Sequence, residues 1–285
     1  MKLHTRTLLL GERTLVMGVL NVTPDSFSDG GLHLAADAAI AWALEMERQG
    51  ADIIDIGGES TRPGSQGISA ETELQRILPV LEGLRGVLKI PISVDTSKAE
   101  VAEAAAGMGA EILNDVTALR NDPRVAEVAR RCKLPLILMH MRGEPRTMQK
   151  LPFARDVMRD VTAGLRRAAA LARRAGVAKS QIILDPGMGF GKSPQQNYEV
   201  LARLPELARL GFPLLVGTSR KSFVGRALGG VPESKRILGT AATVAASILG
   251  GAHIVRVHDV AEMAQVARVT DAILFPRRLA ARITN

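Results

Sequence analysis

The chain has 285 residues, of which 46% are hydrophobic and only 3% aromatic, so a large core has to be built from aliphatic side chains. Its single cysteine, Cys132, excludes an internal disulfide framework and a cysteine-based zinc site. The 37 lysines and arginines outnumber the 29 acidic residues, and the resulting net charge of +8 favours an anionic ligand.

The basic residues do not form a nucleic-acid-binding pattern. Arg166, Arg167, Arg173 and Arg174 are spaced among alanines, as on a solvent-exposed helix face, and no segment interleaves glycine, aromatic and basic residues. The apolar run at the N-terminus is too short for a signal peptide, and no apolar stretch has membrane-spanning length. We therefore expect a cytoplasmic protein that binds neither nucleic acid nor a membrane.

Apolar, β-branched runs alternate with amphipathic stretches along the chain. We expect strands at residues 14–20, 52–56, 90–94, 111–113, 134–139, 181–184, 213–216 and 252–257. We expect helices at residues 35–49, 70–84, 98–108, 123–131, 154–175, 194–210, 220–228 with 233–249, and 260–274. Gly50, Gly109, Gly176 and Gly211 each follow one of these helices, where a glycine commonly ends the helix.

This regular alternation predicts right-handed βαβ units. Eight units favour a single (β/α)8 TIM barrel over residues 1–285, with an open doubly wound sheet as the alternative. The connections at residues 21–34 and 57–69, after the first two strands, are unusually long and rich in Gly, Ser, Pro and Asp. Such connections are typical of flexible binding loops.

Polar residues follow the ends of all eight predicted strands. They are Asn21, Glu59 to Arg62, Asp95 to Ser97, Asn114 with Asp115, His140, Asp185, Ser219 to Lys221, and Arg256 to Asp259. In a barrel the carboxyl ends of the strands face one mouth, where barrel enzymes have their active sites. We therefore expect these side chains to gather at that mouth.

Each of these residues, taken alone, also has an ordinary structural explanation. Asp95, Thr96 or Ser97 could cap the third helix, and Asp259 the last one. Asn114 could satisfy a buried loop and Lys221 could lie on the surface, while for His140 a structural role is the better explanation. The complete set favours a site, because folding alone does not require a polar residue at the end of every strand.

Three of the strand-end residues suit a flat heterocycle. Asp95, Asn114 and Asp185 follow the third, fourth and sixth strands, on one side of the barrel, and offer carboxylate and amide groups. A pair of carboxylates can accept the N–H donors of an amino-pyrimidine. Residues 187–192 are rich in glycine but lack the Walker spacing, and we interpret them as backbone that allows a ligand to approach closely.

Other strand-end residues suit a phosphate group. Lys221, Arg256 and His258 supply positive charge, and Asn21 offers a neutral oxygen. Mg²⁺ prefers few protein oxygens together with phosphate and water, so this set also fits a magnesium phosphate. Residues 219–222 open a predicted helix, whose N-terminus favours an anion.

Two longer motifs resemble the signatures of the dihydropteroate synthase family: NVTPDSFSDGG at residues 21–31 and GGESTRPG at residues 57–64. Shorter motifs follow in the family's order: Asp95-Thr96-Ser97, Asn114-Asp115, Met139-His140-Met141, Asp185-Pro186-Gly187, Ser219-Arg220-Lys221-Ser222 and Arg256-Val257-His258-Asp259. The resemblance extends from about residue 14 to residue 275. Met188 and Arg142 differ from the residues common in the family, but neither difference removes a polar group that the chemistry needs.

The resemblance implies a transferase of folate biosynthesis. Such an enzyme joins para-aminobenzoate to a dihydropterin-methyl diphosphate, which gives dihydropteroate and diphosphate. We expect a dissociative path, in which diphosphate leaves and a neutral arylamine attacks the methylene cation in a water-poor pocket. No strong general base is then required.

The resemblance also implies a role for particular residues. The pterin would be held by Asp95, Asn114, Asp185, Lys221 and Arg256. The diphosphate would be held by Asn21, Thr61, Arg256 and His258, with Asn21 also binding Mg²⁺. The aminobenzoate site, where sulfonamides would compete, would be formed by Thr61, Arg62, Pro63, Phe190, Lys221 and Ser222. Lys221, Asp185, Arg256 and His258 would be the catalytic residues, and the family implies a homodimer formed through the C-terminal helices.

Several other functions fit the sequence less well. A pterin-dependent methyltransferase of the same barrel family, the main alternative, has no use for the two long loops or for diphosphate-binding residues. A Schiff-base aldolase has its lysine inside a strand, whereas Lys221 begins a predicted helix. A basic RNA- or partner-binding module explains the charge but not the strand-end residues. A catalytically inactive relative would be expected to lose loop or site residues, and none is lost.

Overall fold

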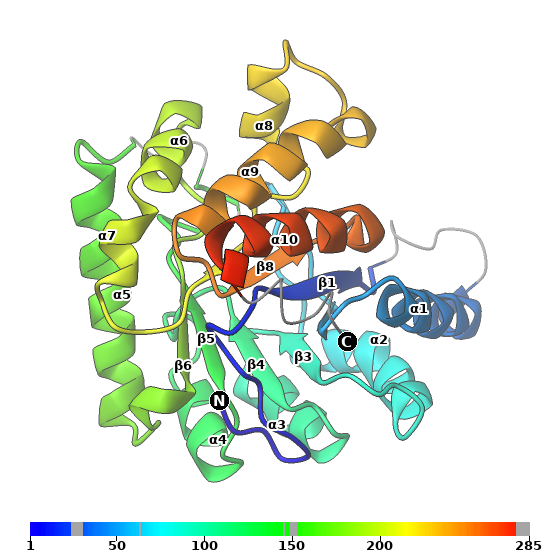
Figure 1. Ribbon diagram of the computed structural model, residues 1–285. Coiled ribbons are helices and arrows are strands. Elements are labelled where there is room, and N and C mark those ends of the chain that lie inside the picture. The colour runs from blue at the N-terminus through cyan, green and yellow to red at the C-terminus, as the bar shows by residue number, and fades with distance from the viewer. Residues whose placement is uncertain (24–30, 63, 145, 149–152, 278–285) are drawn as a thin grey trace.

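The computed structural model describes residues 1–23, 31–62, 64–144, 146–148 and 153–277. Within them, parallel strands form a ring that helices surround (Figure 1). The strand order is β6-β5-β4-β3-β2-β1-β8-β7, and a parallel bridge between Leu184 and Leu214 joins the two ends of the sheet. A doubly wound sheet would reverse its strand order at a switch point. The predicted barrel is therefore confirmed, and the open sheet is wrong.

The strands and helices lie close to their predicted positions. The strands are β1 Leu15–Asn21, β2 Ile53–Gly57, β3 Ile92–Asp95, β4 Ile112–Asp115, β5 Leu136–Met139, β6 Ile182–Asp185, β7 Leu215–Val216 and β8 Ile254–Val257. The helices are α1 Gly31–Arg48, α2 Ala70–Leu84, α3 Ala99–Gly107, α4 Val125–Arg131, α5 Val157–Arg174, α6 Pro194–Ala202, α7 Leu204–Ala208, α8 Ser222–Ala227, α9 Ile237–Leu249 and α10 Val260–Leu274, with 3₁₀ turns η2 Lys179–Gln181 and η3 Glu233–Lys235. No helix among the described residues is long and apolar enough to cross a membrane.

Besides α1, which begins at Gly31 instead of residue 35, three predicted helices are divided or begin differently in the structure. The helix expected over residues 194–210 is divided into α6 and α7, because Pro205 in the first turn of α7 has no amide for a continuous helix. The helix expected from residue 220 begins at Ser222, since Arg220 has a left-handed φ of 57°. The helix expected from residue 233 begins as η3 and continues as α9. The glycines at 50, 109, 176 and 211 have positive φ angles, as expected of residues that end helices.

The two long connections after β1 and β2 differ in length. The β2–α2 connection, expected over residues 57–69, spans residues 58–69 because Gly57 ends β2, and residue 63 within it lies outside the described residues. The β1–α1 connection is shorter than expected because α1 begins at Gly31, and its residues 24–30 also lie outside the described residues.

The start of the β2–α2 connection is held in place by contacts with α2 and with the residue before α3. Arg76 donates a hydrogen bond of 2.7 Å to the Gly58 carbonyl, and Lys98 contacts both Glu59 and the buried Glu73.

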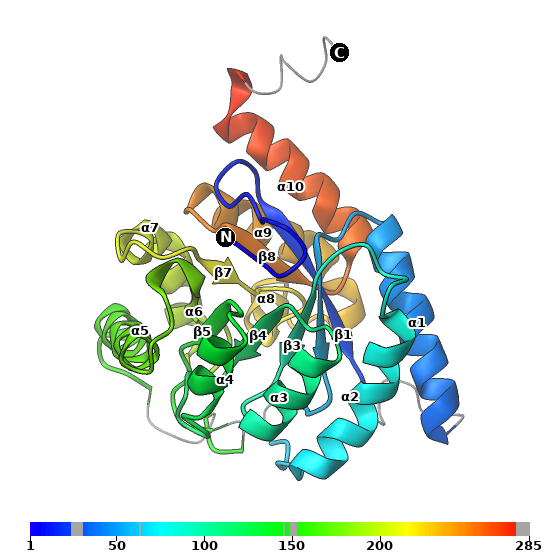
Figure 2. The same cartoon turned by 90° about the horizontal axis from the view of Figure 1, so that it is seen from below.

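The inside of the ring is apolar where the strands begin. Alternate strand residues point inward there and form a buried cluster: Leu15, Met17, Ile53, Ile112, Ile137, Ile183, Leu215 and Ile254. Leu3 and Leu8 of the N-terminal segment pack on this cluster, and Figure 2 shows the dark-blue segment lying in front of the strands. Because side chains alternate along a strand, the next inward position lies two residues further on. Those positions include Asp55, Asn114, Asp185 and Arg256, so the same pattern places polar groups inside the other end of the ring.

Candidate active site

A cavity of about 410 Å³ lies at the carboxyl ends of the strands. Every predicted site residue that the structure describes lines it: Asn21, Thr61, Arg62, Asp95, Asn114, Asp185, Phe190, Lys221, Ser222, Arg256 and His258. Pro63 lies outside the described residues. Val19, Val116, Met139, Met148 and Met188 add apolar wall to the cavity. Polar groups that converge on a partly apolar cavity are typical of a small-molecule site.

The guanidinium of Arg256 is held by two carboxylates inside the ring. Its Nε donates to Asp55 Oδ2 at 2.6 Å, and its Nη2 donates to Asp95 Oδ2 at 3.0 Å. Asn114 Nδ2 donates to the same Asp55 oxygen at 3.0 Å. Burial lowers the pKa of Arg256, but the charges of Asp55 and Asp95 outweigh it and the net shift is upward. The network thus fixes a permanent positive charge against one wall of the cavity.

Asp55 and Arg236 were not singled out in the sequence. Asp55 is fully buried and does not line the cavity, so it acts through Arg256 and Asn114. The available signal was its place two residues after the inward Ile53 in the same strand. Arg236, between η3 and α9, lines the cavity and donates to the carbonyl of Arg220 at 2.8 Å. It sits within a stretch expected to be helical, so nothing marked it as part of the site.

Asp95 does not cap the helix that follows it. The first amide of α3, on Ala99, donates to Asp122 Oδ2 at 3.0 Å, and the amide of Lys98 donates to Thr96 Oγ1 at 3.3 Å. The capping explanation is therefore wrong for Asp95, whose carboxylate meets Arg256 instead. Burial raises the pKa of Asp95, although the charge of Arg256 opposes the shift.

Asp185 and Lys221 carry opposite charges within the same cavity. Asp185 Oδ1 accepts a hydrogen bond of 2.7 Å from the amide of Gly187, while burial raises the pKa of its carboxyl to about 6. Burial also lowers the pKa of Lys221 to about 8, with the charge of Arg256 acting in the same direction. The Lys221 ammonium lies 4.1 Å from the centre of the Phe190 ring. Lys221 is thus an inward-facing group, and the explanation of it as a surface lysine is wrong.

His258 is neutral at pH 7, which corrects its expected positive charge. Burial lowers the pKa of its imidazole to about 3, and the nearby charges of Arg256, Arg220 and Lys221 add to this effect. Its Nδ1 lies 3.0 Å from the hydroxyl oxygen of Ser219. The ring therefore brings a hydrogen-bonding group to the cavity rather than a charge.

Asp259 lies at the N-cap position of α10, but its side chain makes no capping bond. Its carboxylate pairs instead with Arg220, whose Nε donates to Oδ2 at 3.0 Å. The expected capping role is therefore wrong. The pair connects the turn before α8, where Arg220 lines the cavity, to the turn before α10.

The glycines of residues 187–191 allow a close approach to the chain's own backbone. A Cβ on Gly187, which has a φ of 67°, would lie 1.9 Å from the carbonyl oxygen of His140. A Cβ on Gly191 would lie 2.5 Å from the carbonyl oxygen of Arg142. The sequence predicted a close approach by a ligand, whereas the residues approached are those that follow β5. The glycines thus let the segment after β6 pack directly on its neighbour.

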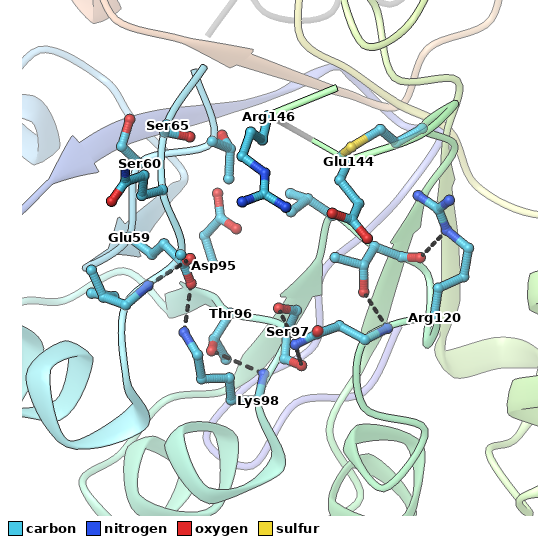
Figure 3. Close-up of a pocket in the computed structure, with 18 of the residues that line it drawn as sticks. Glu59, Ser60, Ser65, Asp95, Thr96, Ser97, Lys98, Arg120, Glu144 and Arg146 are labelled. Carbon is cyan, nitrogen blue, oxygen red and sulfur yellow. Dashed lines mark hydrogen bonds and ion pairs between the residues drawn. The ribbon is translucent and has the colours of Figure 1, made fainter. Parts of the chain in front are cut away.

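A second hollow of about 670 Å³ lies on the other side of Asp95 (Figure 3). It shares Ser60, Thr61, Asp95 and Val116 with the cavity and is also lined by Arg120 and Arg146. Although it is larger, none of Asn114, Asp185, Lys221 or Arg256 lines it. The smaller cavity therefore holds the residues whose chemistry fits a heterocycle and a phosphate.

Comparison with known proteins gives one consistent answer. The family model described as "pterin binding enzyme" matches residues 17–258. A dihydropteroate synthase of Synechocystis is 51% identical over 263 residues, which cover 92% of this chain and 91% of the relative. That of Escherichia coli K12 is 48% identical, with 91% of each chain covered.

Solved structures of dihydropteroate synthases have the same fold. The Yersinia pestis protein, solved with a sulfonamide drug, has a TM-score of 0.90 at 45% identity, with 96% of this chain and 98% of that chain covered. The Clostridium difficile protein, solved in the presence of pteroic acid, has a TM-score of 0.88 at 47% identity, with 94% and 99% covered. The Xanthomonas albilineans protein, solved with 4-aminobenzoic acid, has a TM-score of 0.86 at 43% identity, with 92% and 93% covered.

Proposed function

As a member of the pterin-binding enzymes and, within them, of the dihydropteroate synthases of folate biosynthesis, the chain is a transferase, and we propose how its cavity carries out the transfer. The substrates are para-aminobenzoate and a dihydropterin-methyl diphosphate, and the products are dihydropteroate and diphosphate. The observation that carries this proposal is the convergence of Asp95, Asn114, Asp185, Lys221 and Arg256 on one cavity. The named relatives do not support the alternative of a methyltransferase.

The pterin lies with its amino-pyrimidine edge toward Asp95, Asn114 and Asp185. Carboxylate and amide oxygens at these positions accept N–H bonds from the ring, and the Asn114 amide can donate one in return. Asp55 supports this arrangement, because it holds both Asn114 and Arg256 in place. Lys221 contacts the ring from the side of Phe190.

The diphosphate lies toward Asn21, Thr61, Arg256 and His258. Arg256 supplies the permanent charge, and His258 supplies a hydrogen bond, since its imidazole is neutral at pH 7 before an anion binds. A bound diphosphate would raise the pKa of His258 and favour its protonation. These groups stabilise the negative charge that grows on the leaving group.

The residues around Asn21 fit Mg²⁺ as a companion of the diphosphate. The described residues contain no group of three His, Cys, Asp or Glu side chains suited to a metal ion. Asn21 nevertheless brings a carboxamide oxygen to the cavity beside Gly57, and Mg²⁺ commonly takes its other ligands from phosphate and water. When bound, Mg²⁺ would neutralise part of the charge of the diphosphate.

The transfer follows a dissociative path. The bond between the pterin methylene carbon and the diphosphate oxygen breaks first, and its electron pair leaves with the diphosphate. The cation left on the conjugated pterin is stabilised by the carboxylates of Asp95 and Asp185. The arylamine nitrogen then bonds to the methylene carbon, and its proton passes to water or diphosphate. A strongly acidic arylammonium gives up this proton without a dedicated base.

The aminobenzoate site lies beside Phe190, Lys221 and Ser222, with Thr61 and Arg62 of the β2–α2 connection lining the same cavity. The part of Pro63, which lies outside the described residues, stays a prediction. The Lys221 ammonium is suited to the carboxylate-bearing arylamine or to the pterin ring, since it borders both sites. The Yersinia and Xanthomonas relatives were solved with a sulfonamide and with 4-aminobenzoic acid, which supports the class of ligand proposed for this site. Sulfonamides are therefore expected to compete with aminobenzoate here.

We also propose that the chain forms a homodimer through α9 and α10. These two helices pack on each other and leave Leu249, Val269 and Ile273 exposed. Val269 and Ile273 are 64% and 66% exposed and share one face of α10, as residues four apart do. Exposed apolar patches of this kind mark interfaces. Sedimentation of the wild type and of Ile273→Arg tests this proposal. The wild type is expected to be a dimer and the variant a monomer, and a monomeric wild type would reject the proposal.

The cytoplasmic location stays a prediction.

The test of function is product formation by the purified protein. With Mg²⁺ and both substrates, dihydropteroate and diphosphate should appear in equal amounts. Lys221→Ala should lower turnover about a hundredfold or more, because an aligned charge is lost from both substrate sites, and leave the melting temperature nearly unchanged. An absence of product despite binding of both substrates would reject the assignment.

A further inference from the structure

Lys192 is a buried lysine outside the cavity that the transfer described above does not use. Only 3% of its surface is exposed. Its Nζ lies 2.8 Å from the carbonyl oxygen of Gly187, 3.2 Å from that of Phe190 and 3.1 Å from Nδ1 of His140. The carbonyl oxygen of His140 is a fourth acceptor at 3.5 Å, and these acceptors offset part of the cost of burying an ammonium, whose pKa burial lowers to about 7.

His140 is held in a single tautomer by its two neighbours. Burial lowers the pKa of its imidazole to about 4, so the ring is neutral at pH 7. Since Nδ1 accepts from Lys192, the ring proton lies on Nε2, which is 3.4 Å from Asp160 Oδ2 of α5. A Cβ on Gly164 of α5 would lie 2.5 Å from the His140 ring, so α5 also fixes the ring by close packing. Lys192 is thereby bonded to a rigid part of the fold.

The other partners of Lys192 belong to the segment between β6 and α6. Phe190 in this segment lies under the Lys221 ammonium, and a Cβ on Gly189 would lie 3.2 Å from the Lys221 side chain. Asn197 of α6 holds the same segment from its other side, because its Oδ1 accepts the amide of Gly189 at 2.6 Å. The shape of the segment therefore determines where Phe190 and Lys221 lie.

We infer that Lys192 is a positioning residue for the aminobenzoate subsite, because it ties the segment that carries Phe190 to the end of β5. The inference rests on the proposed function, which assigns Phe190 to that subsite alone and Lys221 to both substrate sites. Without the ammonium, the carbonyls of Gly187 and Phe190 lose their shared donor and the Phe190 ring is free to shift. Asp185 is affected less, since its own backbone is held within β6 and only its side chain, which accepts the amide of Gly187 at 2.7 Å, meets the segment. Loss of Lys192 thus weakens the use of the arylamine more than that of the pterin.

Separate KM values for the two substrates test the inference. Lys192→Met keeps the length of the side chain and removes the ammonium. We expect it to raise the KM for aminobenzoate about tenfold or more, because small displacements at a site are costly, and to change the KM for the pterin diphosphate less than about threefold. The matched control is Lys179→Met, whose ammonium lies 5.2 Å from the centre of the Phe212 ring and which belongs to η2, before the start of β6. It should leave both values unchanged.

A second variant approaches the same segment from its other side. Asn197→Ala removes the acceptor of the Gly189 amide and should give the same selective rise in the KM for aminobenzoate. Backbone hydrogen exchange over residues 187–191 should rise in both variants, while exchange in β5 and α5 stays as in the wild type. Equal rises in the two KM values, unchanged KM values in a folded variant, or failure of both variants to fold would overturn a positioning role.

The exchange measurement separates this inference from the proposed function. A wild-type protein that makes no dihydropteroate contradicts the function, whereas hydrogen exchange needs no turnover and still reports on the segment. Unchanged exchange over residues 187–191 in Lys192→Met would reject the tie between β5 and this segment even in an active enzyme.

Discussion

The carboxylate of Asp55 holds the guanidinium of Arg256 inside the ring of strands, with 2.6 Å between Oδ2 and Nε. The two residues are 201 positions apart in the sequence, and their strands lie on either side of β1. Asp55 is fully buried, whereas Arg256 faces the cavity. Asp55 therefore sets the position of a charge that it does not itself present to a ligand.

Asp55→Asn should destabilise the protein and weaken the use of the pterin diphosphate. Breaking a buried ion pair leaves a charge without its partner, and we expect a loss of roughly 3 kcal/mol in the free energy of unfolding. The control is Asp52→Asn in the same part of the chain, where the carboxylate pairs with the exposed Arg13 at 2.5 Å and also accepts the amide of Val16 at 2.9 Å, a bond for which asparagine keeps an oxygen. That change should cost about 1 kcal/mol or less and leave kcat/KM unchanged. Urea unfolding and steady-state kinetics check both, and equal effects of the two substitutions would contradict the role of Asp55.

The affinity for the pterin diphosphate should fall above about pH 8. Burial lowers the pKa of Lys221 from its usual value of 10.5 to about 8, so the ammonium that attracts the anionic substrate is lost above that pH. Calorimetric titration between pH 6.5 and pH 9.5 measures this fall. Lys221→Met should bind more weakly and lack the fall, whereas Lys192→Met should retain it. A fall of the same size in Lys221→Met would show that another group is responsible.

The imidazole of His258 should stay neutral in the free protein down to about pH 4. Its pKa is lowered from 6.5 to about 3 by burial and by the neighbouring cations, so protonation occurs only well below the usual range. Binding of diphosphate should raise this pKa by about one unit or more, because an opposite charge then lies nearby. Imidazole chemical shifts followed by NMR, with His258→Gln for assignment, measure both values. A free imidazole that titrates near pH 6.5 would contradict the burial effect.

Gly187→Ala should destabilise the segment between β6 and α6. The added Cβ would lie 1.9 Å from a backbone oxygen of His140, and backbone atoms cannot move aside as a flexible side chain can. Gly64 is a matched control, because it also has a positive φ but has no atom within 4 Å of an added Cβ. We expect a loss of about 3 kcal/mol or more for Gly187→Ala and about 1 kcal/mol for Gly64→Ala. Comparable melting temperatures for the two variants would count against the close contact.

The sequence was enough to predict the barrel and the gathering of polar residues at its mouth. Parallel strands bring their carboxyl ends to one side, so residues such as Asn21, Asp95 and Asp185 are placed together by topology alone. This prediction succeeded because it depends only on the local sequence around each residue. Each residue needed only to be recognised as the end of a strand.

Asp55 and Lys192 could not be identified in the same way. Asp55 lies inside a strand, and its importance depends on Arg256 in a strand 201 residues away. Lys192 depends on His140, 52 residues before it. The charge of His258 likewise depends on burial and on neighbouring cations, which sequence position does not reveal. Long-range contacts and desolvation therefore account for what the sequence could not predict.

The most direct measurement is a crystal structure of the protein with a non-hydrolysable pterin diphosphate and Mg²⁺. We expect the amino-pyrimidine edge on Asp95, Asn114 and Asp185, with the diphosphate beside Asn21, Arg256 and His258. A pterin bound instead in the neighbouring hollow lined by Arg120 and Arg146, away from Asn114 and Asp185, would contradict this assignment.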